Sequence, residues 1–175
     1  VLLGHSFGGL AAVLYAALHP VDISGLILSS PALGIYPLVP FTEKIIECAH
    51  LLIPNQVIPK PVRPDKLSSD PLVRESYLSD AHIYKFTGVD FLYSMLQGMR
   101  FVEKNVSQMS VPLLMILAGE DQIVDNRRNI AFFNRLTGAP KEIQIFDGFL
   151  HETFNELNRA KPIDCVRRFL HGLNQ

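Results

Sequence analysis

The chain has 175 residues, of which 48% are hydrophobic, and a formal net charge of −1. This is the composition of a globular protein, and its near-neutral charge gives no electrostatic case for binding nucleic acid. No stretch approaches the roughly 20 consecutive apolar residues that a transmembrane helix needs. The two cysteines, Cys48 and Cys165, lie in apolar helical stretches without metal or redox spacing, which predicts buried, reduced thiols in a cytosol-like compartment.

A short apolar strand at residues 1–3 runs into the sequence Gly-His-Ser-Phe-Gly and then into an apolar, helix-forming run at 10–18. This strand–turn–helix setting is typical of a nucleophile elbow, a sharp turn that holds a serine out over the end of a sheet. Gly4 and Gly8 are expected to relieve crowding, because a Cβ at either position would press on the adjoining backbone. Ser6 is therefore the candidate nucleophile.

The helix after the turn is expected to present the backbone N–H of Phe7 to the position where an oxyanion forms. His5 adjoins Ser6, but adjacent side chains on a sharp turn point in different directions. We therefore expect His5 to be a packing residue and not the catalytic base.

Residues 23–30 form a short apolar run that ends in Ser-Ser-Pro, which predicts a buried parallel strand. From residue 34 to residue 110, prolines crowd the sequence, strand-like runs vanish and helices alternate with irregular loops, so we predict a helical cap inserted into the domain. Residues 1–33 then hold the elbow and the first strands of the core. Residues 111–175 hold the rest of the core, with an acid loop and a histidine loop.

Two apolar stripes at helical spacing lie within the predicted cap, one at 45–53 and one at 91–102. Thr87 and Asp90 offer a capping box for the second helix. The sequence leaves two interpretations of the stripes open. They pack on the domain below, or they form a lid over an acyl-binding groove.

Residues 111–119 restore the buried-strand pattern and lead into an acidic turn that contains Asp121 and Asp125. Asp125 directly precedes a helix-forming run at 126–136 and is best explained as the N-cap of that helix. Asp121 lies at the end of the strand, where a carboxylate that orients a histidine is expected. Asp121 is the preferred catalytic acid, and Asp125 is the alternative.

The last predicted strand covers residues 141–146, and the final helix runs from about residue 162 to residue 169 with a proline in its first turn. Of the six histidines, His151 alone lies in a loop directly after a predicted sheet strand. Strands that alternate with helices outside the cap predict an α/β fold with a mainly parallel sheet of about four strands.

Ser6, Asp121 and His151 each follow a separate predicted strand, in the chain order of the α/β-hydrolases. Each residue type meets a chemical need. Neutral serine is a poor nucleophile, so His151 would take its proton, while Asp121 would fix the imidazole tautomer and stabilise the imidazolium. The three residues together predict acyl transfer.

The sequence that contains these three residues resembles the monoacylglycerol lipase and lysophospholipase branch of the serine α/β-hydrolases from residue 1 to about residue 170. Beyond the elbow, the resemblance is carried by residues 25–33, 69–72, 111–114 and 119–121. It implies a triad of Ser6, Asp121 and His151, and a lid whose apolar face admits a single acyl chain. We expect a cytoplasmic hydrolase of small lipid esters without cofactor or metal. We leave open its oligomeric state and a transient contact of the cap with a membrane surface.

Members of this family begin with several strands and an early loop that supplies a second oxyanion-hole N–H, and neither is found in these residues. We therefore expect the chain to be the C-terminal portion of such a hydrolase and to be inactive alone, because its first strand would be an exposed apolar edge. A general carboxylesterase, a cap-bearing peptidase and a non-catalytic truncated product remain as alternatives. The peptidase would need acids that hold a substrate amine, and four acidic residues of the cap leave it open: Glu43, Glu47, Asp80 and Asp90.

Overall fold

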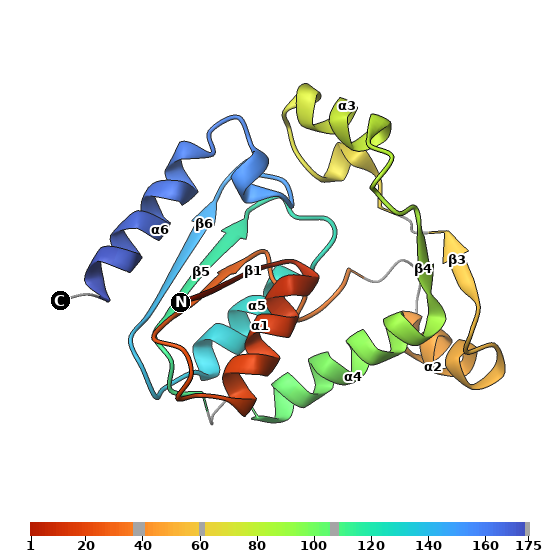
Figure 1. The fold of residues 1–175 in the computed structure, drawn as a ribbon, viewed down its shortest axis with the longest axis horizontal. Helices are drawn as coiled ribbons and strands as arrows, with labels where there is room; N and C mark the ends of the chain where they lie inside the picture. Colours follow the sequence, from red (N-terminus) through yellow and green to blue (C-terminus); the bar gives the residue numbers. More distant parts are fainter. Residues whose placement is uncertain (37–40, 60–61, 106–108, 174–175) are drawn as a thin grey trace.

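A parallel sheet of four strands forms the centre of the molecule (Figure 1). The computed structural model describes residues 1–36, 41–59, 62–105 and 109–173. The strands lie in the order β1-β2-β5-β6 and run over Leu2–His5 (β1), Leu26–Ser29 (β2), Leu113–Ala118 (β5) and Lys141–Phe146 (β6). Because all neighbouring pairs are parallel, the carboxyl ends of the strands meet at one edge of the sheet. The predicted α/β fold is confirmed.

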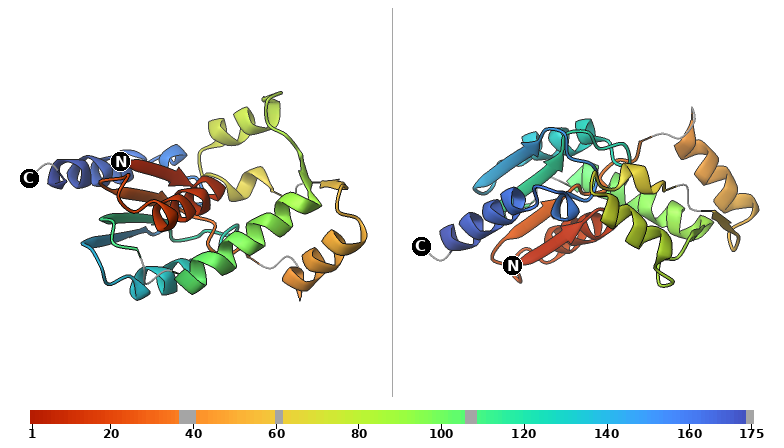
Figure 2. Two further views of the ribbon diagram at one scale, coloured as in Figure 1. Left: turned by 60° about the horizontal axis from the view of Figure 1, so that its bottom comes forward. Right: turned by 90° about the horizontal axis from the view of Figure 1, so that it is seen from above.

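Helices cover both faces of the sheet, which explains why every residue of β2 and β5 is buried. One face carries α1 (Phe7–Leu18), α4 (Val89–Asn105) and α5 (Asn126–Arg135), and α6 (Ala160–Gly172) lies on the other (Figure 2). Successive side chains of a strand therefore enter different cores. Met115 packs with the first group of helices, whereas Leu114 packs with Cys165 of α6.

The predicted cap contains more than helices. Along the chain it has α2 (Thr42–Leu52), β3 (Val57–Pro59), a short 3₁₀ turn (Pro64–Lys66), α3 (Pro71–Ser79), β4 (Phe86–Gly88) and α4. The expectation that strands vanish here was wrong, because β3 and β4 pair as a two-stranded antiparallel sheet. The predicted cap boundaries, 34 and 110, stay a prediction, and its residues 37–40, 60–61 and 106–108 lie outside the described residues.

The start of α4 also differs from expectation. Thr87 lies in β4 and pairs with Ile58 of β3. The Asp90 carboxylate forms a hydrogen bond with His50 Nδ1 of α2, at 2.7 Å. A capping box between Thr87 and Asp90 is therefore replaced by a strand and by a contact between two cap helices.

The two apolar stripes of the cap differ in how far they are buried. Leu96, Met99 and Val102 of α4 are buried, and Gly98 lets this helix approach α1 so closely that a Cβ there would lie 3.1 Å from Leu14. On α2 only Ile46 is buried, while Leu52 of the same stripe is 76% exposed. The stripe of α4 is thus a packing face along much of its length, and the stripe of α2 is largely open to solvent.

The two cysteines also differ in burial. Cys165 is buried as predicted, but Cys48 is exposed on α2, because that helix packs against the rest of the chain along one edge only. Among the described residues, no helix combines the length and the apolar character needed to cross a bilayer.

Candidate active site

The turn between β1 and α1 has the backbone of a strained elbow. Ser6 has φ 53° and ψ −121°, a conformation that costs a non-glycine residue of the order of 1–3 kcal/mol. A Cβ on Gly4 would lie 2.4 Å from the carbonyl oxygen of Gly8, so only glycine fits where β1 passes the start of α1. The turn therefore holds Ser6 at the carboxyl end of β1.

The expected role of Gly8 in relieving crowding was wrong. A Cβ at Gly8 would meet no atom within 4 Å, whereas one at Gly9 would lie 2.7 Å from the side chain of Pro31. The second close approach is made by the next residue because α1 crosses the chain that leaves β2, a tertiary contact that the turn motif does not encode.

The three predicted site residues come together at the carboxyl edge of the sheet. His151 Nε2 lies 2.9 Å from Ser6 Oγ, and His151 Nδ1 lies 2.8 Å from Asp121 Oδ2. Both His151 and Asp121 are buried. The carboxylate fixes the tautomer with the proton on Nδ1, which leaves Nε2 as the acceptor for the serine hydroxyl.

Asp121 and Asp125 have separate partners. Asp121 Oδ1 accepts hydrogen bonds from the N–H groups of Ile123 at 2.8 Å and Val124 at 3.0 Å, which leaves Oδ2 to His151. Asp125 caps α5 by accepting from the Arg127 N–H at 3.0 Å. Its hydrogen bonds with the Arg127 side chain, which outweigh the effect of burial, hold the pKa of the Asp125 carboxyl below its usual value. Asp121 is the carboxylate that faces the histidine.

A second polar row, which the sequence did not reveal, lies behind the first. His5 Nδ1 is 3.1 Å from Ser29 Oγ, and Ser29 Oγ is 2.8 Å from Thr153 Oγ1. The His5 ring lies 4.9 Å from the ring of His151. Burial, followed by the proximity of His151, lowers the pKa of His5, so His5 is neutral at neutral pH and its ring packs against His151. The Ser-Ser pair that ends β2 was the available signal for this row.

Phe7 begins α1, so its N–H has no acceptor within the helix and lies at the positive end of the helix dipole. The side chain of Phe7 is 44% exposed and meets Phe91 of α4 edge-on, with ring centroids 4.7 Å apart. An apolar surface shared by the elbow and the cap therefore adjoins the serine.

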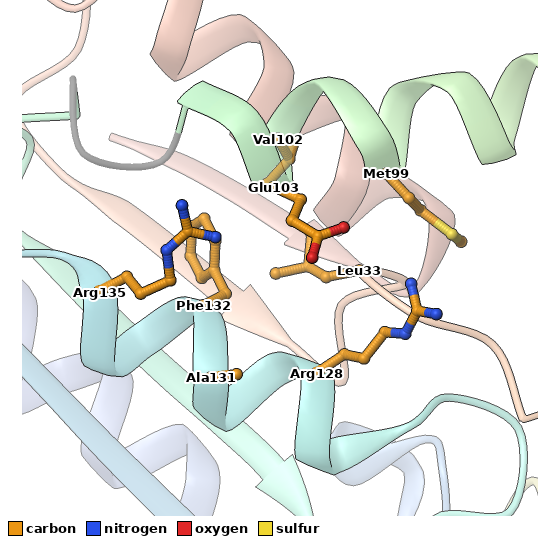
Figure 3. A pocket seen from close by; sticks show the side chains of 8 residues that line it. All are labelled: Leu33, Met99, Val102, Glu103, Arg128, Ala131, Phe132 and Arg135. Carbon is orange, nitrogen blue, oxygen red and sulfur yellow. The ribbon is translucent and has the colours of Figure 1, made fainter.

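Two cavities lie away from the serine. One of about 100 Å³ lies between α4 and α5, with Glu103, Arg128 and Arg135 among its lining residues (Figure 3). One of about 440 Å³ lies between α3 and the histidine loop, and Glu152 is among its lining residues. Neither is lined by Ser6, Asp121 or His151. Within the described ranges, no cluster of three or more His, Cys, Asp or Glu side chains is arranged to hold a metal ion.

Comparisons with known proteins identify the family of the chain. A family model described as serine aminopeptidase S33 matches residues 1–158. The chain is 29% identical over 174 residues to phospholipase YtpA of Bacillus subtilis, covering 96% of the chain and 66% of that protein. It is 28% identical over 159 residues to the human monoglyceride lipase, covering 89% and 52%.

Among solved structures, the monoacylglycerol lipase of Paleococcus ferrophilus superposes with a TM-score of 0.88 at 25% identity, over 98% of this chain and 66% of that one. The chain thus spans between about half and two thirds of the length of these three relatives.

Proposed function

Because the chain belongs to the serine aminopeptidase S33 family, we propose that it carries the catalytic residues of a serine ester hydrolase. Its α/β-hydrolase fold, which it shares with the monoacylglycerol lipases, supports this proposal. The observation that supports this most directly is the continuous row of hydrogen bonds from Ser6 through His151 to Asp121. In this proposal Ser6 is the nucleophile, His151 the general base and then acid, and Asp121 the group that orients the imidazole.

The reaction proceeds in two halves. Ser6 Oγ attacks the ester carbonyl carbon while its proton passes to His151 Nε2, and the negative charge on the carbonyl oxygen is stabilised by the Phe7 N–H. The tetrahedral species collapses to an acyl-serine, and His151 gives the proton to the departing alcohol. Water, deprotonated by His151, then attacks the acyl-serine, releasing the carboxylic acid and restoring Ser6.

The strained turn suits this chemistry. Serine held at φ 53° does not need to reorganise its backbone to expose Oγ, and both hydrogen bonds of His151 are already formed. Preorganised groups of this kind lower the barrier because positioning is complete before the substrate reacts.

We assign the substrate class as lipid monoesters, monoacylglycerols or lysophospholipids. The relatives are called lipases and a phospholipase, which supports a lipid ester. The exposed rings of Phe7 and Phe91, in contact beside the serine, supply an apolar surface for an acyl chain.

The cap offers a way to reach such substrates. Phe41 is 73% exposed, Leu51 81% and Leu52 76%, and all three belong to the cap around α2. Lipid monoesters gather at membrane surfaces, where exposed apolar side chains gain free energy by leaving water. A transient contact of α2 with a membrane surface is therefore part of the proposal.

The acids of the cap favour an ester over a peptide with a free amine. Glu43 and Glu47 are both paired with Arg100, and Glu43 is also paired with Arg128. Asp90 is bonded to His50 and Asp80 accepts from the His82 N–H. Each of the four acids that the peptidase alternative relied on therefore has a partner within the protein.

The test is a series of p-nitrophenyl esters of increasing acyl length, with an aminoacyl p-nitroanilide as comparison, in the full-length protein and its Ser6→Ala variant. Each buried CH₂ contributes about 0.8 kcal/mol, so four extra methylenes give about 3 kcal/mol, or roughly a hundredfold in kcat/KM. We expect kcat/KM to rise with chain length and the anilide to be a poor substrate. A flat series would remove the lipid assignment, and faster cleavage of the anilide would favour the peptidase. Turnover that survives Ser6→Ala, or none in the wild type, would remove the proposed mechanism.

A further inference from the structure

Glu156 is a buried carboxylate that the proposed mechanism does not use. It lies five residues after His151, just beyond the short 3₁₀ turn Thr153–Asn155, and is 1% exposed. A buried charge is costly unless hydrogen bonds compensate it, so its partners identify what the charge stabilises.

Those partners lie on two segments far apart in the sequence. Glu156 Oε1 accepts from the Leu150 N–H at 2.8 Å and from the Ser69 N–H at 3.0 Å, and Oε2 accepts from the Ser69 hydroxyl. Leu150 is the residue directly before His151. Ser69 belongs to the cap and lies just before α3.

Further hydrogen bonds join the same two segments. The Glu152 N–H donates to the Leu67 carbonyl oxygen at 2.8 Å, and the Ser68 hydroxyl donates to the Asn155 carbonyl oxygen at 2.8 Å. Ser68 is itself fully buried. Residues 67–69 of the cap and residues 150–156 of the histidine loop are therefore one cross-linked unit, with the Glu156 carboxylate at its centre.

From this arrangement we propose that Glu156 is a positioning residue, which fixes the backbone of the histidine loop against the cap and thereby holds His151 between Ser6 and Asp121. The proposal rests on the proposed function for its catalytic consequence. His151 must stay within hydrogen-bond reach of two groups at once, and a misplacement of about 1 Å costs roughly a hundredfold in rate. The Glu156 carboxylate accepts from the N–H of Leu150, so it fixes the backbone position of the residue that directly precedes His151.

The test compares Glu156→Ala with Glu156→Gln in the full-length protein. Glutamine keeps an oxygen that accepts from Leu150 and Ser69, and its amide group donates to the Ser69 hydroxyl, whereas alanine removes all three bonds. We expect Glu156→Ala to lower kcat about a hundredfold with KM within about twofold, and Glu156→Gln to retain most of kcat. Leu136→Ala, a buried truncation at the end of α5, is the control for lost stability and should leave kcat unchanged at temperatures below its melting transition.

A second readout does not depend on turnover. The proton on His151 Nδ1, bonded to Asp121, should give a low-field proton NMR signal, assigned by its absence in His151→Gln. We expect this signal to be lost or broadened in Glu156→Ala and kept in Glu156→Gln and Leu136→Ala. A Glu156→Ala protein with an unchanged signal would overturn the positioning role, as would wild-type kcat in that variant. A signal that responds as expected in a protein without Ser6-dependent turnover would sustain the positioning role and refute the hydrolase.

Discussion

His151 Nε2 lies 2.9 Å from Ser6 Oγ although 145 positions separate the two residues in the chain. The contact forms because β1 and β6 are parallel members of one sheet, so the residues that follow them leave at the same edge.

Ser6→Ala should abolish covalent labelling by a fluorophosphonate probe and leave the melting temperature nearly unchanged. Alanine fits the space of serine and meets the same backbone strain, so only the nucleophile is lost. Ser30→Ala is the matched control, because Ser30 also follows a strand end with a positive φ, of 40°, and its replacement should leave labelling unchanged. Labelling that persists in Ser6→Ala would exclude Ser6 as the nucleophile.

Asp121→Asn should lower kcat by about 10⁴ with little change in melting temperature. The asparagine oxygen still accepts from the N–H groups of Ile123 and Val124, but its NH₂ group faces His151 Nδ1 and stabilises the wrong tautomer. Steady-state kinetics with a p-nitrophenyl ester and a thermal melt measure both effects. Near-normal kcat would mean that Asp121 does not orient His151.

Asp125→Ala should act on stability and leave kcat within a few-fold. It removes the N-cap of α5, which contributes about 0.5–2 kcal/mol. The free energy of unfolding from urea titration gives the cost, and the same ester assay gives kcat. Loss of turnover without loss of stability would reverse the assignment of the two acids.

His5→Gln should make stability less sensitive to acid. Burial, with the added effect of His151, lowers the folded-state pKa of His5 below its unfolded value of 6.5, and nearby Glu152 and Asp121 oppose this shift without cancelling it. The stability that neutral His5 contributes is thus fully present above pH 6.5 and is lost as the pH falls through the lower folded-state pKa. Urea unfolding at neutral pH and at about pH 5 should show a larger loss for the wild type than for His5→Gln. Equal losses would show that His5 is not desolvated.

The 175 residues expressed by themselves should aggregate and show no Ser6-dependent turnover. β1 is an edge strand of the described sheet, and Val1 and Leu3 are 59% and 49% exposed. An unpaired apolar edge promotes association with other chains. A cooperative thermal melt together with Ser6-dependent cleavage of a p-nitrophenyl ester would contradict this expectation.

Much of the core could be predicted from the sequence because its signals are local. An apolar run such as residues 113–118 forms a buried strand wherever helices cover both faces, and Asp125 before a helix-forming run caps that helix with its own side chain. The strand–turn–helix pattern around Ser6 likewise requires only its immediate neighbours. The positions of Asp121 and His151 after separate strands then followed from the parallel topology.

Only the tertiary structure decided the contacts that join distant segments. The second close approach at the elbow is made by Gly9 and not by Gly8, because Pro31, which follows β2, packs against Gly9. The pairing of β3 with β4 joins two short strands that are separated in the chain by α3. The tertiary structure also revealed Glu156 as the buried link between the cap and the histidine loop. A sequence pattern records which residues can be buried or can bond, but the choice of partner depends on which segments packing brings within about 3 Å, and that is fixed only when the whole chain folds.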